Sequence, residues 1–243
     1  MHMTIRLMAV LGAAVAASWT AMAGNLIFVG DSTLATRKPE QRIGSWGDSM
    51  KDQLKEGWKI VNVAVGGATV KSIQGGKVSR WQKAQDAMQK GDFVVVQFGI
   101  NDAGKKKFVD TPEFKAEFAK FADRIREKGA TPVFCSPVAS GTYGKKDGKY
   151  ARSASRDKYA AATREIATEK KVDFIDMTEL TCGVLQAMEK AAGEDYYVGK
   201  KTGKDGKPAF DTTHPSKAGA KRFGEAFIAD AKARKLPIAE IFK

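Results

Sequence analysis

Five short runs of apolar, largely β-branched residues recur along the chain, at 26–29, 60–65, 93–98, 132–137 and 172–175. They lack a clean alternation of apolar and polar positions. Uninterrupted apolar runs of this length are typical of strands that are buried on both faces of a parallel sheet. The pattern therefore predicts five such strands.

Between these runs, apolar residues recur three or four positions apart, which is the spacing of a helix with one buried face. The clearest stretch covers 114–125 and is followed by Gly129, and two more cover 159–170 and 218–233. Strands that alternate with helices join into a parallel sheet with helices on both faces. We expect an α/β fold of three layers, an α/β/α sandwich around a five-stranded parallel sheet.

The first 23 residues have the form of a secretion signal. Arg6 supplies a positive charge, 7–17 is apolar, and Ala21-Met22-Ala23 is a small-residue cleavage site before Gly24. The apolar stretch is shorter than the roughly 20 residues that span a bilayer, although a membrane anchor is the alternative. We expect cleavage, export to the periplasm or the medium, and no stable membrane insertion. Residues 24–243 contain no linker and no repeat, so a single domain is expected.

The formal net charge of the whole chain is +13. Arg6 is the one charged residue of the expected signal, so residues 24–243 carry +12. Lysines cluster at 105–107 and 200–207. A solvated surface is the first interpretation, and attraction for an acidic polymer or cell envelope is the second. A nucleic-acid partner is not expected, because no aromatic interleaving or binding motif accompanies the charge.

The two cysteines are expected to be buried free thiols. Cys135 lies inside an apolar run, and Cys182 lies in a segment that resembles the start of a helix. Export would permit a disulfide, so the pairing stays open. With one histidine after residue 23 and cysteines so placed, no metal site is expected.

Polar residues follow three of the predicted strands where each one ends. Gly30-Asp31-Ser32 follows the first strand, Gly66-Gly67 the second, and residues 99–102 the third. The carboxyl ends of parallel strands border the ligand crevice of such sheets. These residues are therefore expected at one edge.

His214 is the one histidine after the expected signal, and Asp211 stands three residues before it. A serine hydroxyl becomes a good nucleophile when a base takes its proton, and Ser32 follows the first strand at a turn. Asp211 would orient the imidazole. The ordinary alternatives are helix capping around Ser32, a turn aspartate at Asp211, and a surface histidine before a proline at His214. Pro215 disfavours a helical conformation for His214, so we expect this histidine in an outward-facing loop from which it can reach Ser32.

Attack on an ester would also create an oxyanion that needs hydrogen-bond donors. The backbone N–H of Ser32, an N–H of the Gly66-Gly67 pair and the amide of Asn101 are suitable in kind. The alternatives are that the two glycines only form a turn and that Asn101 only bonds the backbone.

The chain resembles the SGNH (GDSL-type) hydrolases, and within them the rhamnogalacturonan acetylesterase-like carbohydrate esterases. Four blocks carry the resemblance in order, at 30–33, 62–67, 91–102 and 211–216, and 43–48 resembles the Gly-Trp-Gly segment of the acetylesterases. The resemblance implies a flavodoxin-like fold, catalytic residues Ser32, Asp211 and His214, and an oxyanion hole from Ser32, Gly67 and Asn101.

Two departures concern the substrate. The acetylesterases usually have histidine where this chain has Ile100, and a polar residue where it has Ala68. Both positions flank the oxyanion donors, so ester chemistry is expected to survive while the sugar and acyl group stay open. The lysine-rich insert at 197–210 is expected to reshape the rim of the site.

The expected function is that of an exported serine esterase that removes O-acetyl groups from a polysaccharide without a cofactor. Its partner would be an acetylated carbohydrate, for which the charge favours an acidic polymer, and a monomer is expected. The rival interpretations are a lipid or thioester hydrolase, a polysaccharide O-acetyltransferase, and a non-catalytic carbohydrate-binding protein.

Overall fold

The computed structural model describes residues 23–75, 79–144, 146–202 and 208–243. Five strands form one parallel sheet in the order β2-β1-β3-β4-β5, which confirms the predicted sheet. The strands are β1 (Gly24–Gly30), β2 (Trp58–Asn62), β3 (Phe93–Gln97), β4 (Thr131–Cys135) and β5 (Asp173–Ile175).

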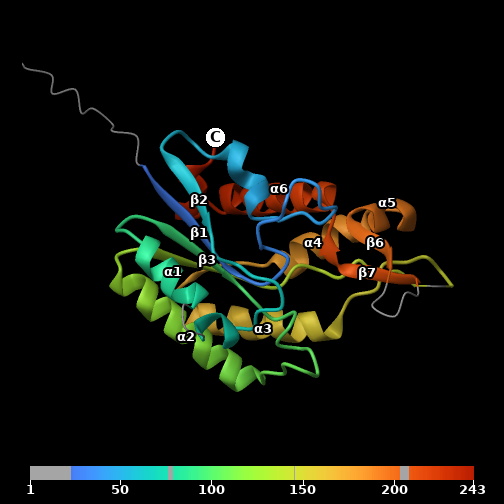
Figure 1. The fold of residues 1–243 in the computed structure, drawn as a ribbon, viewed down its shortest axis with the longest axis horizontal. Helices are drawn as coiled ribbons and strands as arrows, with labels where there is room; N and C mark the ends of the chain where they lie inside the picture. Colours follow the sequence, from blue (N-terminus) through green and yellow to red (C-terminus); the bar gives the residue numbers. More distant parts are fainter. Residues whose placement is uncertain (1–22, 76–78, 145, 203–207) are drawn as a thin grey trace, which may run out of the picture.

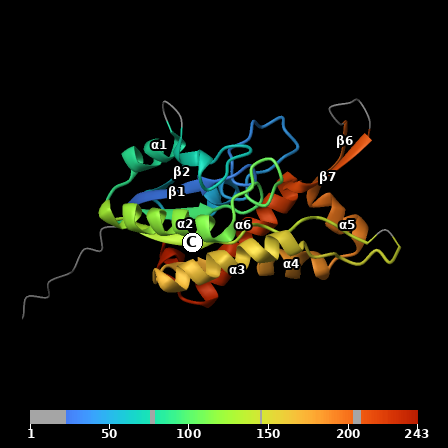
Figure 2. The same ribbon diagram turned by 90° about the horizontal axis from the view of Figure 1, so that it is seen from below.

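Helices cover both faces of this sheet, as Figure 1 shows. On one face lie α1 (Arg80–Ala87), α2 (Thr111–Glu127) and α3 (Ala154–Glu169), and on the other lie α4 (Met177–Gln186) and α6 (Lys217–Ala233). The view turned by 90° places α5 (Lys190–Asp195) beside a separate hairpin of β6 (Tyr197–Thr202) and β7 (Pro208–Pro215) (Figure 2). The short helices are η1 (Asp48–Gln53), η2 (Ser72–Gln74) and η3 (Pro237–Ile241).

Strand β1 shows why the apolar runs do not alternate with polar residues. Leu26 and Phe28 belong to the core that contains Phe223 of α6, whereas Ile27 and Val29 belong to the core on the other face. All four strand residues are fully buried. Successive side chains of a strand point to opposite faces, so a sheet that is covered on both sides needs apolar residues at every position.

The structure places the end of β2 earlier than the sequence pattern does. The regular strand stops at Asn62, although the Val63 and Val65 N–H groups still donate to β1 carbonyls, at 3.0 and 3.1 Å. The Asn62 side chain accepts a hydrogen bond from the Ala64 N–H at 3.0 Å. Residues 63–65 therefore stay alongside β1 while the chain begins to turn toward Gly67.

The predicted final helix is confirmed as α6. The Ser216 hydroxyl accepts a hydrogen bond from the Gly219 N–H at 3.2 Å and caps the helix. The pattern did not identify α1, α5 or the hairpin as elements. These are short segments, and the hairpin packs outside the main sheet, so their periodicity is weak.

Cys135 and Cys182 are both buried and free. Their positions, at the end of β4 and inside α4, agree with the expectation of two buried thiols. Among the described residues, no helix is long and apolar enough to cross a membrane.

Candidate active site

The first part of the site is a turn that follows β1. The carbonyl of Asp31 accepts hydrogen bonds from the Leu34 and Ala35 N–H groups, so residues 31–35 form one tight turn and no α-helix follows directly. The buried Asp31 carboxylate accepts from the Thr33 N–H and hydroxyl, at 2.9 and 2.8 Å, and from the Gln97 amide at 3.1 Å. Burial raises the pKa of Asp31 and these hydrogen bonds oppose the rise. The turn holds Ser32 at the carboxyl edge of the sheet.

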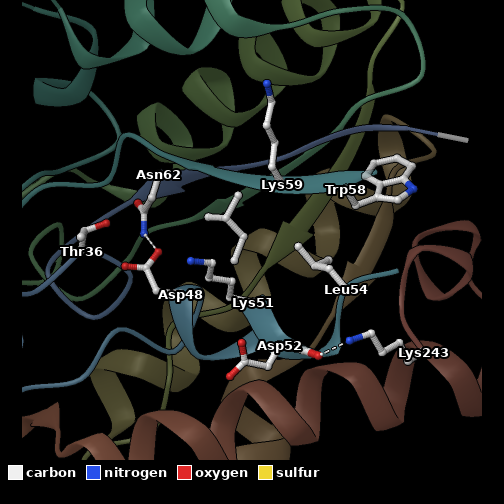
Figure 3. A pocket seen from close by; sticks show the side chains of 10 residues that line it. Thr36, Asp48, Lys51, Asp52, Leu54, Trp58, Lys59, Asn62 and Lys243 are labelled. Carbon is white, nitrogen blue, oxygen red and sulfur yellow. Dashed lines mark hydrogen bonds between the residues drawn. The ribbon is translucent and has the colours of Figure 1, made fainter. Parts of the chain in front are cut away.

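The side chain of Asn62, at the end of β2, makes further hydrogen bonds that support this turn. The Asn62 amide donates to the Leu34 carbonyl and to Asp48, each at 2.7 Å. Figure 3 shows the Asn62–Asp48 pair at one end of a cavity of about 720 Å³ that follows the outer edge of β2. Neither Ser32 nor His214 is among the residues that line this cavity. Its contribution to the site is the support that Asn62 gives to the turn.

The structure brings Ser32, His214 and Asp211 together from opposite ends of the chain. The Ser32 Oγ lies 2.9 Å from His214 Nε2, and His214 Nδ1 lies 2.9 Å from the Asp211 Oδ2. Ser32 and Asp211 are buried, whereas the side chain of His214 is 26% exposed. The imidazole is thus within reach of both solvent and the serine hydroxyl.

The expectation that His214 lies in an outward-facing loop is wrong, because the residue belongs to β7. Pairing of Pro215 with Tyr197 keeps this segment extended. The Asp211 Oδ1 accepts from the Thr213 and His214 N–H groups, both at 3.0 Å. The strand is also fixed to the rest of the fold, since the Gly141 N–H donates to the Thr212 carbonyl at 2.8 Å.

The segment that resembles a Gly-Trp-Gly block connects the two halves of the site. The Trp46 N–H donates to the Thr33 carbonyl at 3.2 Å, and the Gly44 N–H donates to the Pro215 carbonyl at 2.9 Å. A side chain at Gly44 would place its Cβ 2.5 Å from the Ala220 Cβ, so this close approach requires glycine. The segment thereby holds the serine turn and the histidine strand in register.

The expected oxyanion donors lie on the loops after β2 and β3. Gly67 has a φ of +74°, a conformation that favours glycine. Within the part of the chain that the structure describes, the N–H groups of Ser32 and Gly67 donate to no other protein group. The Asn101 amide donates to the Ala68 carbonyl at 2.9 Å, which leaves its second amide hydrogen for another acceptor.

Sequence reasoning missed Arg37, which donates a hydrogen bond to the carbonyl of Ser32. Burial lowers the pKa of Arg37, and the Asp31 and Asp211 carboxylates oppose that shift. The guanidinium therefore adds positive charge beside two acidic groups of the site. The only sequence signal for this contact is that Arg37 lies five residues after Ser32, and a spacing of five residues is not typical of any regular element.

The two positions that depart from the acetylesterase pattern hold apolar side chains that are at least partly buried. Ile100 packs partly buried against the core, and Ala68 is buried. Residues 197–202 and 208–210 of the insert belong to β6 and β7, the hairpin strands of which β7 carries Asp211. Residues 203–207, and the side chains of Lys200 and Lys201, lie outside the description, so the lysines expected there are not placed.

Comparisons with known proteins extend these observations. Residues 28–222 match the GDSL-like lipase/acylhydrolase family. A Bacillus subtilis protein named "Probable rhamnogalacturonan acetylesterase YesY" is 27% identical over 223 residues, which cover 90% of this chain and 97% of that protein. A rhamnogalacturonan acetylesterase of Emericella nidulans is 25% identical, with 86% and 85% covered.

Solved structures show the same fold. Protein YxiM of Bacillus subtilis has a TM-score of 0.75 at 23% identity, and the match covers 88% of this chain but 58% of that one. An acetylxylan esterase from Geobacillus stearothermophilus has a TM-score of 0.59 at 21% identity, with 85% and 93% covered. The sequence match to the family spans most of the chain and includes Ser32, Asp211 and His214. The chain therefore belongs to the GDSL-like lipase/acylhydrolase family.

Proposed function

We propose that this chain is an exported serine esterase that removes O-acetyl groups from a polysaccharide through an acyl-Ser32 intermediate. The observation that carries the proposal is the continuous hydrogen-bonded chain from the Ser32 hydroxyl through His214 to Asp211. Two relatives that match most of the chain are named rhamnogalacturonan acetylesterases, which supports carbohydrate acetyl esters as the substrate class.

The geometry supports a double displacement. The Ser32 Oγ attacks the acetyl carbonyl carbon while its proton passes to His214 Nε2, 2.9 Å away. The tetrahedral intermediate collapses as the bond to the sugar oxygen breaks, and His214 returns the proton to that oxygen. Water then attacks the acetyl-enzyme with His214 as base, and acetate leaves as the proton returns to Ser32. Asp211 stabilises the imidazolium formed in each half-reaction.

The oxyanion of each tetrahedral intermediate would accept hydrogen bonds from the N–H groups of Ser32 and Gly67 and from the Asn101 amide. Donors that are fixed in place before the reaction stabilise charge that develops only in the transition state. The positive φ of Gly67 and the Asn101–Ala68 hydrogen bond supply that fixation.

Replacing either Ser32 or His214 by alanine should lower kcat for acetate release by on the order of 10⁴ or more, because these groups act as a unit. The measurement is steady-state hydrolysis of p-nitrophenyl acetate, with circular dichroism as the control for folding. A folded His214→Ala variant that kept most of its activity would show that the base is another group.

The same assay separates the rival functions. Preference for long-chain p-nitrophenyl esters over the acetate would favour a lipid or thioester hydrolase, and acetyl transfer to an added sugar would favour a transferase. Binding of acetylated glycans without turnover would favour a carbohydrate-binding protein.

Asn101→Ala should lower kcat roughly 10²- to 10³-fold and leave KM nearly unchanged, because the oxyanion is absent from the ground state. Steady-state kinetics with one acetyl ester measures both constants. Thr142→Ala is a suitable control, since Thr142 is an exposed polar residue whose hydroxyl bonds only the Ser140 hydroxyl among described groups. A change confined to KM in Asn101→Ala would assign this side chain to substrate binding.

The polymer that we propose is acidic, in keeping with the net charge of +12 that remains when Arg6 of the signal is subtracted from +13, and with the names of the two relatives. The kcat/KM for an acetylated galacturonate-containing pectin should fall steeply as salt rises to about 0.15 M, where charges are screened beyond roughly 8 Å. Hydrolysis of neutral p-nitrophenyl acetate should hardly change over the same range.

Two matched double variants test whether the lysines near the site are the ones that attract the polymer. Lys105→Gln/Lys106→Gln removes two exposed charges from the loop after Asn101 and should reproduce part of the loss. Lys55→Gln/Lys128→Gln removes two exposed charges from the opposite edge of the sheet and should have less effect. Equal salt dependence for pectin and the small ester, or faster turnover of neutral acetylated xylan, would refute an acidic substrate.

Export is the remaining part of the proposal, and it rests on the charged, apolar and small-residue segments of 1–23. When the full chain is produced in a Gram-negative host, the protein released from the periplasm or medium should begin at Gly24. Intact mass and N-terminal sequencing measure this. An intact Met1 on protein that stays in the cytoplasm would contradict it.

A further inference from the structure

Asp102 is a buried carboxylate next to Asn101 that the mechanism above does not use. Its two oxygens accept hydrogen bonds from two different loops, from the Val70 N–H and from the Gly99 N–H, each at 2.9 Å. Val70 lies three residues after Gly67, and Gly99 lies two residues before Asn101. One carboxylate therefore joins the loop of each expected oxyanion donor.

The backbone of Asp102 is anchored as well. Its carbonyl accepts from the Val109 N–H at 3.0 Å and from the Tyr159 hydroxyl of α3 at 3.1 Å. The residue is fully buried, so its position is set by these contacts and by the core around it. The second connection between the same loops is the hydrogen bond from Asn101 to the Ala68 carbonyl.

We infer that Asp102 is a positioning residue, which holds the Gly67 N–H and the Asn101 amide at the separation that the oxyanion requires. Catalytic groups lose efficiency steeply when they are displaced by about 1 Å. An asparagine at this position has the same shape but only one oxygen, so one of the two loop N–H groups would face an NH₂ group. The loop with the lost hydrogen bond would then shift its oxyanion donor.

The carboxylate is poised to change its charge within the working range of an enzyme. Burial raises the pKa of Asp102 to about 6, while the hydrogen bonds from Val70 and Gly99 lower it and the Asp31 carboxylate adds to the rise. Other titratable groups near Asp102 come from the neighbouring elements: Asp31 from the turn after β1 and Tyr159 from α3. The loop after Asn101 contributes Lys107, whose ammonium binds the Gly67 carbonyl at 2.5 Å. Above about pH 6 the ionised group accepts both loop N–H groups, and below it the protonated group resembles asparagine.

The test is Asp102→Asn, compared with the matched control Asp92→Asn. Asp92 is also buried and also accepts from two backbone N–H groups, those of Asn25 at 2.7 Å and Gln89 at 2.9 Å, but it lies at the amino end of β3. Asp102→Asn should lower kcat for acetyl ester hydrolysis roughly 10- to 100-fold with KM within about twofold. Asp92→Asn should lower the thermal midpoint by about as much as Asp102→Asn does, but it should leave kcat unchanged.

Two further readouts separate positioning from a general loss of stability. In the Asn101→Ala background, Asp102→Asn should cost a smaller factor in kcat than in the wild-type background, because one of the donors it positions is already absent. The ratio of wild-type kcat to Asp102→Asn kcat should also shrink as pH falls through about 6, because the protonated carboxyl of the wild type resembles the asparagine of the variant. Equal costs in both backgrounds, or a ratio that does not change with pH, would overturn the inference.

If Asp102→Asn does not fold, Tyr159→Phe is the second variant, because it removes the hydroxyl that contacts the carbonyls of Asp102 and Val109 and keeps the ring. It should lower kcat severalfold without raising KM, and an unchanged kcat would refute the inference. The inference rests on the proposed esterase activity. Activity that survives in Ser32→Ala would refute that function, whereas a Ser32-dependent enzyme with an undisturbed Asp102→Asn variant would refute only the role of Asp102.

Discussion

Burial of the central sheet on both faces is the constraint on which the other features of the structure depend. A parallel sheet covered by helices on each side leaves only its edges for polar chemistry. Strand β1 has no exposed apolar position, so the chain can present a reactive group only where the strand ends, at Gly30. The same holds for β3, and the loops after β1, β2 and β3 consequently meet at one edge.

That edge is polar but lies against a closely packed core, so its backbone N–H groups need fixed partners. Two buried carboxylates supply them: Asp31 inside the serine turn, and Asp102 between the loops of Gly67 and Asn101. Burying a carboxylate is costly unless it is hydrogen-bonded, and the raised pKa of each group reflects the part of that cost that remains. The gain is rigidity at the positions where charge would develop during ester hydrolysis.

The site also depends on contacts between the two ends of the chain. His214 reaches Ser32 because β7 is paired with β6, fixed to the loop after β4, and held by Gly44 at Pro215. The hairpin is the part of the fold that departs most from the regular alternation of strand and helix. It also carries Asp211 and His214, so the hydrogen bonds that fix β7 also fix the position of the base.

The sequence by itself determined the parallel sheet, its main helices and the residue types of the site. Apolar periodicity is a local property of the chain, and the one histidine after residue 23, three residues after an aspartate, is visible without any structure. Only the tertiary structure decided that β2 ends at Asn62, that His214 lies in a strand, and that Arg37 reaches the Ser32 carbonyl. It alone also showed that one carboxylate joins two loops. The reason is physical: these are hydrogen bonds between residues that are often far apart in the sequence, and their formation depends on how the packed layers bring loop backbones within about 3 Å of one another.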